Sequence, residues 1–276
     1  MNIEKVKESK NMNENNPSTP IKITVVVTYV LMIIMNALAN ILPINGKGTG
    51  EVSDAYPNLF APAGITFSIW GVIYFLLALY VLYQLGILKS GTRDGNRNLL
   101  TRIGIVFSIS SVANVLWILT WHYDLILLST VLMLVILVSL IMINFMTKNA
   151  VLSGRERFFI RLPFSVYFGW ITVATIANVT TLLVDIGWNG FGISESIWTI
   201  VILAVGAAIG ILTMISFRDM AYGVVLIWAY GGILYKHIIP DGFDRAYIFV
   251  IIAAAICIFL FVMAEGYLFF STKKKR

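Results

Sequence analysis

The chain has 276 residues, of which 59% are hydrophobic and 12% are charged, and its formal net charge is +6. A mean hydropathy of +0.87 lies far above what a water-exposed surface can carry, which excludes a soluble enzyme or a soluble binding module. Because a backbone in hydrocarbon has no water to bond, only helices or a closed barrel can cross a bilayer. The apolar runs are about 20 residues long and do not alternate, so they predict α-helices.

Taken in chain order, the apolar runs predict an all-α integral membrane protein with about eight transmembrane helices. The polar joints between them hold too little apolar material to fold alone, so no soluble domain is expected. The ends of the chain predict a disordered polar tail over residues 1–22 and a basic tail over residues 271–276. The predicted spans cover residues 23–43, 62–86, 99–121, 125–146, 162–184, 196–217, 220–238 and 246–270.

The distribution of basic residues predicts the orientation in the membrane, because Lys and Arg near span ends resist translocation. Seventeen of the 20 Lys and Arg residues lie in the two tails and in the joints after spans two, four and six. The opposite side keeps only Lys47, Lys236 and Arg245. We therefore expect a multi-pass protein of the cell membrane with both termini in the cytoplasm. Topology accounts for the positive charge, so nucleic-acid binding is not expected.

Two features raise alternatives that the rest of the sequence does not favour. Span one ends in Ala37-Leu38-Ala39, which resembles a signal-peptidase site, but its removal would leave seven spans and break the charge pattern. Single residues such as Cys257, His122 and His237 have no metal-ligand partners at a suitable spacing. The sequence also lacks a nucleophile elbow and a phosphate loop. We predict no metal site, no catalytic residue and no enzymatic activity.

The most informative pattern is a set of aromatic and amide residues spaced by three or four positions in spans two, three and five. This spacing places each set on one helical face. At 1.5 Å per residue, Trp70, Asn114 and Asn178 would lie at a similar depth and could line one chamber. The sets comprise Phe67, Trp70 and Tyr74 in span two, Asn114, Trp117 and Trp121 in span three, and Tyr167, Trp170, Ala174 and Asn178 in span five.

A structural interpretation of the same residues stays open at this stage. Trp and Tyr gather in interfacial belts, and Asn side chains join helices by hydrogen bonds. A belt fits Trp188, Trp198 and Trp121, which lie near predicted helix ends. Trp70 and Trp170 are too deep for a belt, so they belong either to ordinary packing or to a pocket.

Two further segments carry polar groups. The joint over residues 44–61 is rich in Gly, bears Glu51 and Asp54, and is long enough to cover a pocket as a lid. Glu265 lies toward the cytoplasmic end of the last span, where a carboxyl group can extend to the headgroups.

At these residues the sequence resembles the tryptophan-rich sensory protein family, also called the translocator protein or peripheral benzodiazepine receptor family (TspO). The stretch from Pro57 to Tyr74 is similar to the family's Pro-Ser-Trp-x-Pro-Pro-Gly entry to helix two. Asn114 and Trp117 match the Asn-x-x-aromatic pattern of helix three. The helix-five pattern Tyr-x-x-Trp-x-x-x-Ala-x-x-x-Asn is matched by Tyr167, Trp170, Ala174 and Asn178.

The sequence departs from the family pattern in the entry motif, at the residue before the helix-five Tyr and in the chain length. Leu59 stands where the entry motif has Trp, and Val166 stands where Pro precedes the helix-five Tyr. The resemblance therefore implies a TspO-like five-helix bundle over residues 23–184 and three additional transmembrane helices over residues 185–270.

The resemblance implies a membrane receptor or sensor for planar hydrophobic molecules such as porphyrin or haem. A tetrapyrrole is then a ligand and not an obligate cofactor. The expected partners are the lipid bilayer and a small hydrophobic ligand. Whether the protein forms a homodimer is left open. A secondary transporter of such a solute is the alternative, and an enzyme that degrades porphyrin is a third class without the residues for it. The expected ligand-binding residues are Trp70, Tyr74, Asn114, Trp117, Trp121, Tyr167, Trp170, Ala174 and Asn178.

Overall fold

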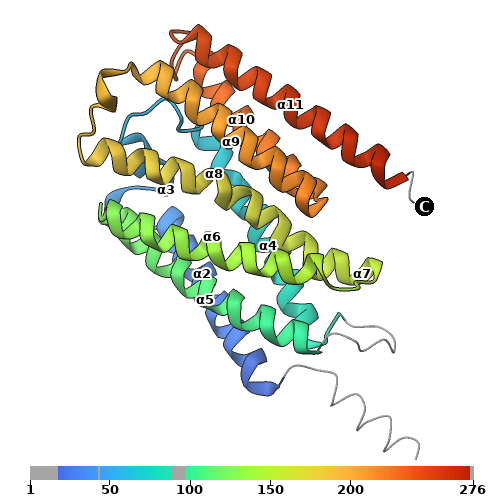
Figure 1. Cartoon of the computed structure of the whole chain (residues 1–276). Coiled ribbons are helices and arrows are strands. Elements are labelled where there is room, and N and C mark those ends of the chain that lie inside the picture. The colour runs from blue at the N-terminus through green and yellow to red at the C-terminus, as the bar shows by residue number, and fades with distance from the viewer. Residues whose placement is uncertain (1–17, 43, 89–96, 274–276) are drawn as a thin grey trace, which may run out of the picture.

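The computed structural model describes residues 18–42, 44–88 and 97–273, and within these residues it contains helices and no strand. Eight long helices run alternately up and down through one bundle (Figure 1). In chain order the elements are α2 (Thr19–Ile41), η1 (Ile44–Gly46), α3 (Thr49–Asp54), η2 (Gly64–Ser68), α4 (Ile69–Leu85), α5 (Arg97–His122), α6 (Ile126–Lys148), α7 (Gly154–Glu156), η3 (Arg157–Arg161), α8 (Leu162–Asp185), η4 (Gly190–Gly192), α9 (Glu195–Phe217), α10 (Met220–Ile238) and α11 (Ile248–Lys273).

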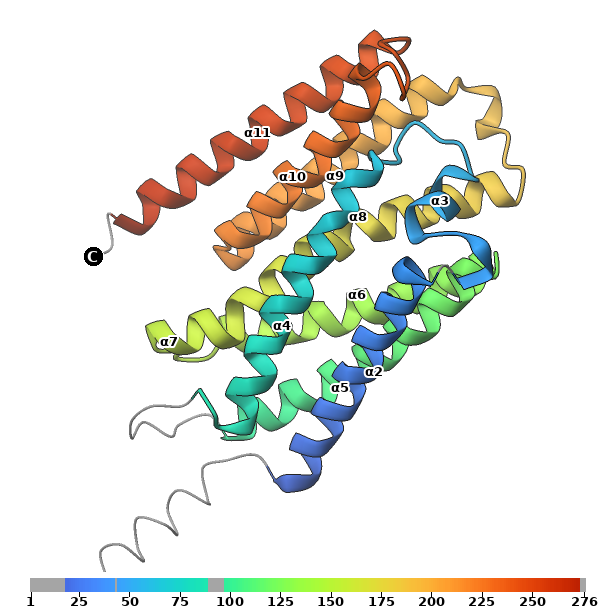
Figure 2. The same ribbon diagram turned by 180° about the vertical axis from the view of Figure 1, so that it is seen from behind.

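The helices form two groups with α8 and α4 between them. Helices α2, α5 and α6 lie on one side, and α9, α10 and α11 lie on the other, as both views show (Figure 1, Figure 2). Helix α8 packs against α6 and α4 of the first half of the chain and against α10 of the second half. Helix α8 therefore joins the two groups.

The N-terminal half of α8 is buried on all sides. Every residue from Pro163 to Val173 is buried. Small residues in this stretch let neighbouring helices approach closely, as is usual where membrane helices pack. At Gly169 a β-carbon would lie 2.9 Å from the backbone oxygen of Tyr222 and 2.9 Å from Cβ of Val225, so α10 lies directly on the α8 backbone.

The helix boundaries agree with the predicted spans to within a few residues, with one correction at the N-terminus. Helix α2 begins at Thr19, so residues 19–22 are helical and do not belong to the predicted tail. Pro20 lies at the start of this helix, where its missing N–H has no partner to lose and its fixed φ favours the first turn. Helix α11 likewise continues to Lys273, into the segment predicted as the basic tail. Residues 1–17 and 274–276 lie outside the described residues.

Seven helices of the described chain are long and apolar enough to cross a membrane, namely α2, the η2–α4 unit, α5, α6, the α7–α8 unit, α9 and α11. Helix α10 is less apolar because it contains three glycines and three tyrosines and ends near Lys236 and His237. It packs along α8, α9 and α11 inside the same bundle, and this position completes the predicted set of eight.

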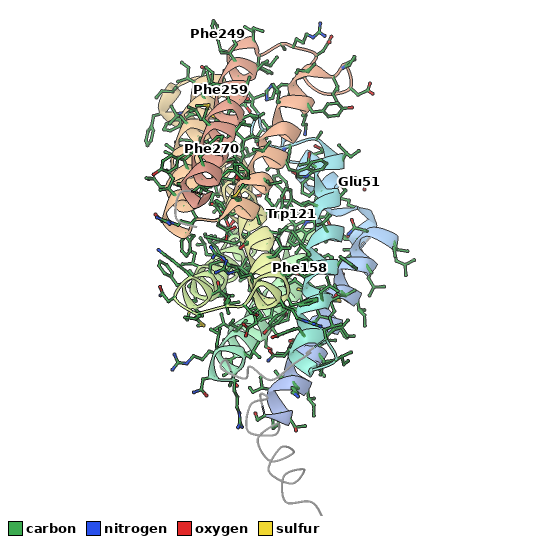
Figure 3. All side chains as sticks on the ribbon, turned by 90° about the vertical axis from the view of Figure 1, so that its right-hand side faces the viewer. Glu51, Trp121, Phe158, Phe249, Phe259 and Phe270 are labelled. Carbon is green, nitrogen blue, oxygen red and sulfur yellow. The ribbon has the colours of Figure 1, made fainter. Side chains whose placement is uncertain are left out.

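The outer surface of the bundle is apolar. On α11 the side chains of Phe249, Phe259 and Phe270 point away from the protein along one face (Figure 3), and they are 71%, 62% and 70% exposed. Exposed aromatic and aliphatic residues in such numbers require an apolar solvent. A lipid bilayer is therefore the environment of this multi-pass protein.

The start of α2 and the end of α11 lie at the same end of the bundle (Figure 2). The segment of residues 44–66, named here the covering segment, lies at the other end, together with the α8–α9 and α10–α11 turns. The end with the start of α2 and the last turn of α11 is named the opposite end. The end with the covering segment is named the covered end. The assignment of the opposite end to the cytoplasm stays a prediction from the charge distribution.

Replacement of Gly169 by Ala should destabilise the protein by about 1–3 kcal/mol, because the added methyl group must displace the backbone of α10. Gly71 is the matched control, since it is also helical but a β-carbon there has no neighbour within 4 Å. Gly71→Ala should be neutral or slightly stabilising. Thermal unfolding in detergent measures both, and equal effects of the two substitutions would contradict the close α8–α10 contact.

Candidate functional site

Trp70 is the centre of an aromatic cluster formed by α4, α5 and α8. Its ring stacks on Tyr74 at a centroid distance of 5.3 Å and lies 6.2 Å from Trp117. It meets Tyr167 and Trp170 edge-on at 5.9 Å and 6.1 Å. The residue sets predicted on the three helices therefore do face one another.

Hydrogen bonds of the two predicted asparagines, Asn178 and Asn114, hold this cluster in place. The Trp117 indole N–H donates to Asn178 Oδ1 at 2.9 Å, and Asn178 Nδ2 donates to Ser129 Oγ at 3.0 Å and to Thr130 Oγ1 at 2.9 Å. All three partners of Asn178 are groups of the protein. The amide holds the indole of Trp117 and ties α8 to α6, and the prediction that Asn178 also contacts a ligand stays a prediction.

Asn114 is engaged in the same way on the other side of Trp70. Its Nδ2 donates to the Tyr167 hydroxyl at 3.3 Å, and its Oδ1 accepts from Asn36 Nδ2 at 2.7 Å. Asn114 is fully buried. This chain of hydrogen bonds connects α2, α5 and α8 at one level of the bundle.

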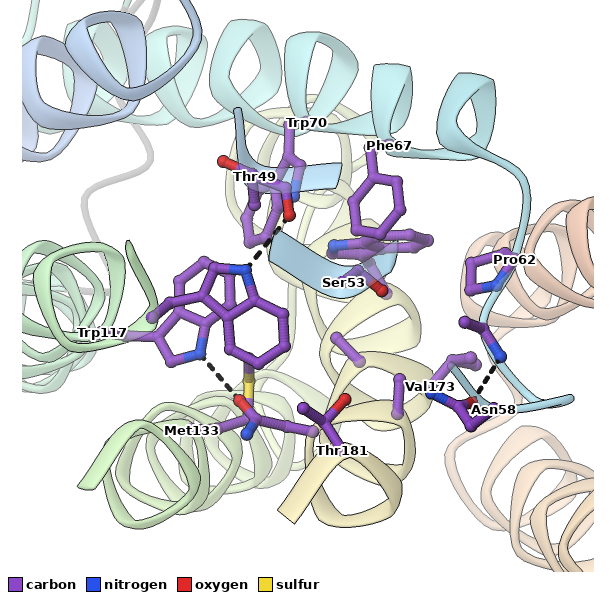
Figure 4. A pocket seen from close by; sticks show the side chains of 16 residues that line it. Thr49, Ser53, Asn58, Pro62, Phe67, Trp70, Trp117, Met133, Val173 and Thr181 are labelled. Carbon is purple, nitrogen blue, oxygen red and sulfur yellow. Dashed lines mark hydrogen bonds between the residues drawn. The ribbon is translucent and has the colours of Figure 1, made fainter. Parts of the chain in front are cut away.

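A cavity lies between this aromatic cluster and the covering segment (Figure 4). Its volume is about 40 Å³ when counted as the space open to the centre of a water molecule, and one ordered water needs roughly 10–15 Å³ on this measure. The cavity thus has room for a few atoms. It is lined by Thr49, Ser53, Asn58, Ala61, Pro62, Phe67, Trp70, Trp117, Trp121, Met133, Trp170, Val173, Ala174, Ala177, Asn178 and Thr181.

The predicted residues divide into two sets with respect to this cavity. The lining includes Trp70, Trp117, Trp121, Trp170, Ala174 and Asn178. Tyr74, Asn114 and Tyr167 are not part of the lining and support Trp70 from behind. Helical spacing identified the correct face but could not separate the residues at the cavity from those one layer deeper.

Trp121 does not belong to an interfacial belt, which is the structural interpretation that its position near a helix end suggested. It is 5% exposed, stacks on Trp117 at 5.8 Å and donates its indole N–H to the backbone oxygen of Thr49 at 3.1 Å. A belt residue would place its N–H at the headgroups. Here the covering segment folds over the end of α5 and encloses the ring.

Two polar groups at the cavity have no partner among the described residues. The indole N–H of Trp170 is buried and donates no hydrogen bond, and the same is true of the Thr49 hydroxyl. Trp170 is 2% exposed. An unpaired buried donor costs free energy of about 1–3 kcal/mol, which a bound acceptor could recover.

The sequence did not single out the cavity residues of the covering segment. Ser53 and Asn58 lie on a joint whose helical turn α3 was not expected, and Met133 is one of many apolar residues on α6. Asn58 also shapes the segment, because its Oδ1 accepts from the backbone N–H of Phe60 and of Ala61. The feature of the sequence that could have indicated this turn is Asn58 directly after Pro57.

The first half of the chain holds one side of the covering segment. Tyr56 donates its hydroxyl to Asp124 Oδ1 at 3.2 Å. Partial burial, reinforced by the nearby Asp124 carboxylate, raises the pKa of Tyr56 to about 12. The phenol therefore keeps its proton near neutral pH, and this hydrogen bond persists.

Helices α9 and α10 hold the other side. The backbone N–H of Leu59 donates to Glu195 Oε1 at 3.1 Å, and the Leu59 oxygen lies 2.9 Å from His237 Nε2. Lys236 forms an ion pair with Asp54 at 2.7 Å. The backbone N–H of Ala63 also donates to the Gly232 oxygen. Helices α9 and α10 are thus part of the structure that holds the covering segment over the cavity.

Comparison with known proteins agrees with this arrangement. A family model described as TSPO-like protein matches residues 22–267. The chain belongs to the TSPO-like protein family. The match includes α9, α10 and most of α11 of this TSPO-like protein. Neither a curated protein nor a solved structure matches the chain.

In this TSPO-like protein, Glu195→Ala should speed hydrogen exchange of the Leu59 amide, because that amide loses its acceptor. Glu195→Gln retains an acceptor oxygen and should restore slow exchange. Glu156→Ala is the matched control, since Glu156 caps α7 at the opposite end. Exchange mass spectrometry of peptides from residues 49–66 reports the result, and equal exchange in all variants would show that α9 does not hold the covering segment.

Proposed function

We propose that this membrane protein is a receptor for planar, largely apolar ligands such as porphyrins, bound between the covering segment and the Trp70 cluster. The observation that carries the proposal is the unpaired indole N–H of Trp170 in the wall of an aromatic cavity. A ligand with a hydrogen-bond acceptor at its edge would satisfy this donor, and the rings of Phe67, Trp70 and Trp117 would contact its face. Sites of this kind combine many apolar contacts with few orienting polar groups.

The lining favours recognition of a ring system over recognition of a metal. Among the described residues that line the cavity there is no His or Cys, and Met133 carries the one sulfur atom. Ligation of haem iron commonly uses His, Cys or Met. We therefore expect metal-free porphyrin to bind at least as tightly as haem.

Ligand entry requires a change in the closed cavity, because about 40 Å³ is smaller than a macrocycle. The aromatic cluster is held by the buried amides of Asn178 and Asn114. The covering segment is held by hydrogen bonds and ion pairs at its two sides. The Lys236–Asp54 pair is partly exposed, and exposed pairs contribute only about 0–1 kcal/mol. We expect the covering segment to move on binding and the base of the cavity to stay fixed.

The alternative is a secondary transporter of a small hydrophobic or tetrapyrrole-like solute. The observation in its favour is Glu265, a carboxyl group buried between helices of the second group. Carboxyl groups inside membrane proteins are commonly parts of proton or ion pathways. Accumulation of protoporphyrin in proteoliposomes only under a proton gradient would favour transport over sensing.

Titration of protoporphyrin with the purified protein, followed by its main absorption band, tests the receptor proposal. Trp170→Phe keeps a ring but removes the N–H, and it should weaken binding by about tenfold, the equivalent of roughly 1.4 kcal/mol. Trp70→Ala removes the central ring and should abolish binding. Trp188→Phe is the control, because Trp188 packs on Trp198 away from the cavity.

Unchanged affinity in both the Trp170→Phe and the Trp70→Ala proteins would refute the proposed site. Circular dichroism and thermal unfolding should show that both variants remain folded. A loss of affinity in Trp188→Phe of the same size would mean that the effect is not specific to the cavity.

A further inference from the structure

Glu265 differs from the other acidic residues of the described chain in its surroundings. It lies on α11, about 12 Å along the helix from the last described residue. Both carboxyl oxygens are buried and have no hydrogen-bond partner within the described residues. Extension of this side chain to the headgroups, as the sequence suggested, is therefore not what the structure shows.

The side chain points toward the interior of the second helix group. Phe261, Ala264 and Leu268 occupy the same face of α11 and are buried, whereas Val262 and Met263 on the other side are exposed. A β-carbon at Gly223 would lie 2.1 Å from Glu265 Oε1. The absent side chain of Gly223 thus leaves a notch on α10 that accommodates the carboxyl group.

The same notch also accommodates an apolar group from α9. A β-carbon at Gly223 would lie 2.4 Å from Cε and 3.0 Å from Sδ of Met214. Helices α9 and α10 are the elements against which α11 packs. The carboxyl group of Glu265 is therefore enclosed where all three helices meet.

The charged groups near this notch are already committed to other partners. Asp219 accepts from Ser165 and from the backbone N–H of Tyr222, and it lies 3.8 Å from Arg161 Nε. Arg161 in addition donates to the backbone oxygens of Phe217 and Arg218. Asp219 is acidic like Glu265 and cannot balance its charge.

The other ionisable groups on the helices around the notch do not neutralise the Glu265 carboxyl either. The Tyr222 hydroxyl donates to Thr172 Oγ1 at 3.2 Å, on the α8 side of α10. Arg218 is exposed at the α9–α10 turn. On α9 the residue that reaches the notch is Met214, which does not ionise. Among the described residues, the Glu265 carboxyl therefore has neither an ion pair nor a hydrogen bond.

We propose that Glu265 is a proton-binding site, neutral in the packed state, and that loss of its proton separates the end of α11 from α10. An ionised carboxylate without partners in an apolar site is far more costly than a neutral acid. On ionisation the group must reach water or a cation. Because α9 and α10 are the main packing partners of α11, its end at the opposite end of the bundle can move without disturbing the cavity.

This inference does not rest on the proposed ligand. It concerns a proton as the bound species and an interface away from the aromatic cavity. It would add a proton-linked movement of α11 to either the receptor or the transporter proposal.

Infrared spectroscopy of the full chain in nanodiscs tests the protonation state directly. A carbonyl band of a neutral carboxylic acid should be present at neutral pH and absent in Glu265→Gln. Glu195→Gln is the matched control and should retain the band, because Glu195 already accepts a backbone hydrogen bond. A spectrum of the unchanged protein without such a band at neutral pH would overturn the proposal.

A carbodiimide that reacts with neutral carboxyl groups in apolar surroundings gives a second measurement that needs no variant. Peptide mapping should find Glu265 modified at neutral pH, and its modification should decrease as the pH rises. Absence of modification at Glu265 while other carboxyl groups react would count against a neutral acid, even if Glu265→Gln failed to fold.

The movement is tested by spin labels at Arg218→Cys and Phe270→Cys in a Cys257→Ala background. The distance between the labels should increase as the acid band disappears at high pH, and it should stay constant in Glu265→Gln. A band that disappears without any change in distance would overturn the proposed separation of α11 from α10.

Discussion

Burial of α8 on all sides is the constraint on which the rest of the structure depends. A membrane helix that faces lipid can be apolar without further detail, but a helix with protein on every side must match four neighbours at once. Helix α8 meets this demand with Gly169, where α10 lies on the backbone, and with hydroxyl and amide side chains that bond to α6, α5 and α10. The two helix groups are consequently one folded unit, and the family match across residues 22–267 follows the same limits.

The polar groups around the aromatic cluster bond to other groups of the protein and hold the rings in place. In an apolar interior an amide without partners is costly, so Asn178 and Asn114 satisfy their donors and acceptors within the protein. Their bonds fix Trp117 and Tyr167, and these rings in turn limit the positions of Trp70. The indole of Trp170 then acquires significance, because it is buried without an acceptor among the described residues, whereas the buried indoles of Trp117 and Trp121 both donate hydrogen bonds.

The second helix group supplies half of the groups that fix the covering segment. The covering segment contains a short helix, α3, which is too short to be stable alone in water. Its position is set by Asp124 on one side and by Glu195, Lys236 and His237 on the other. Removal of α9 and α10 would leave the cavity without half of the groups that hold its cover. The same group also encloses Glu265, at a distance from the cavity.

The sequence by itself determined the helical fold, the approximate positions of the long helices and the faces that carry Trp70, Trp117 and Trp170, because hydropathy and helical periodicity are local properties. Its motifs also identified the family. Only the tertiary structure decided which members of each face reach the cavity, since Tyr74 and Asn114 share a periodicity with residues that line it. It also decided that Trp121 is enclosed, that Glu265 turns inward and that α9 and α10 hold the covering segment. These outcomes depend on contacts between residues far apart in the chain, such as Leu59 with Glu195 and Gly223 with Glu265, which no local pattern contains.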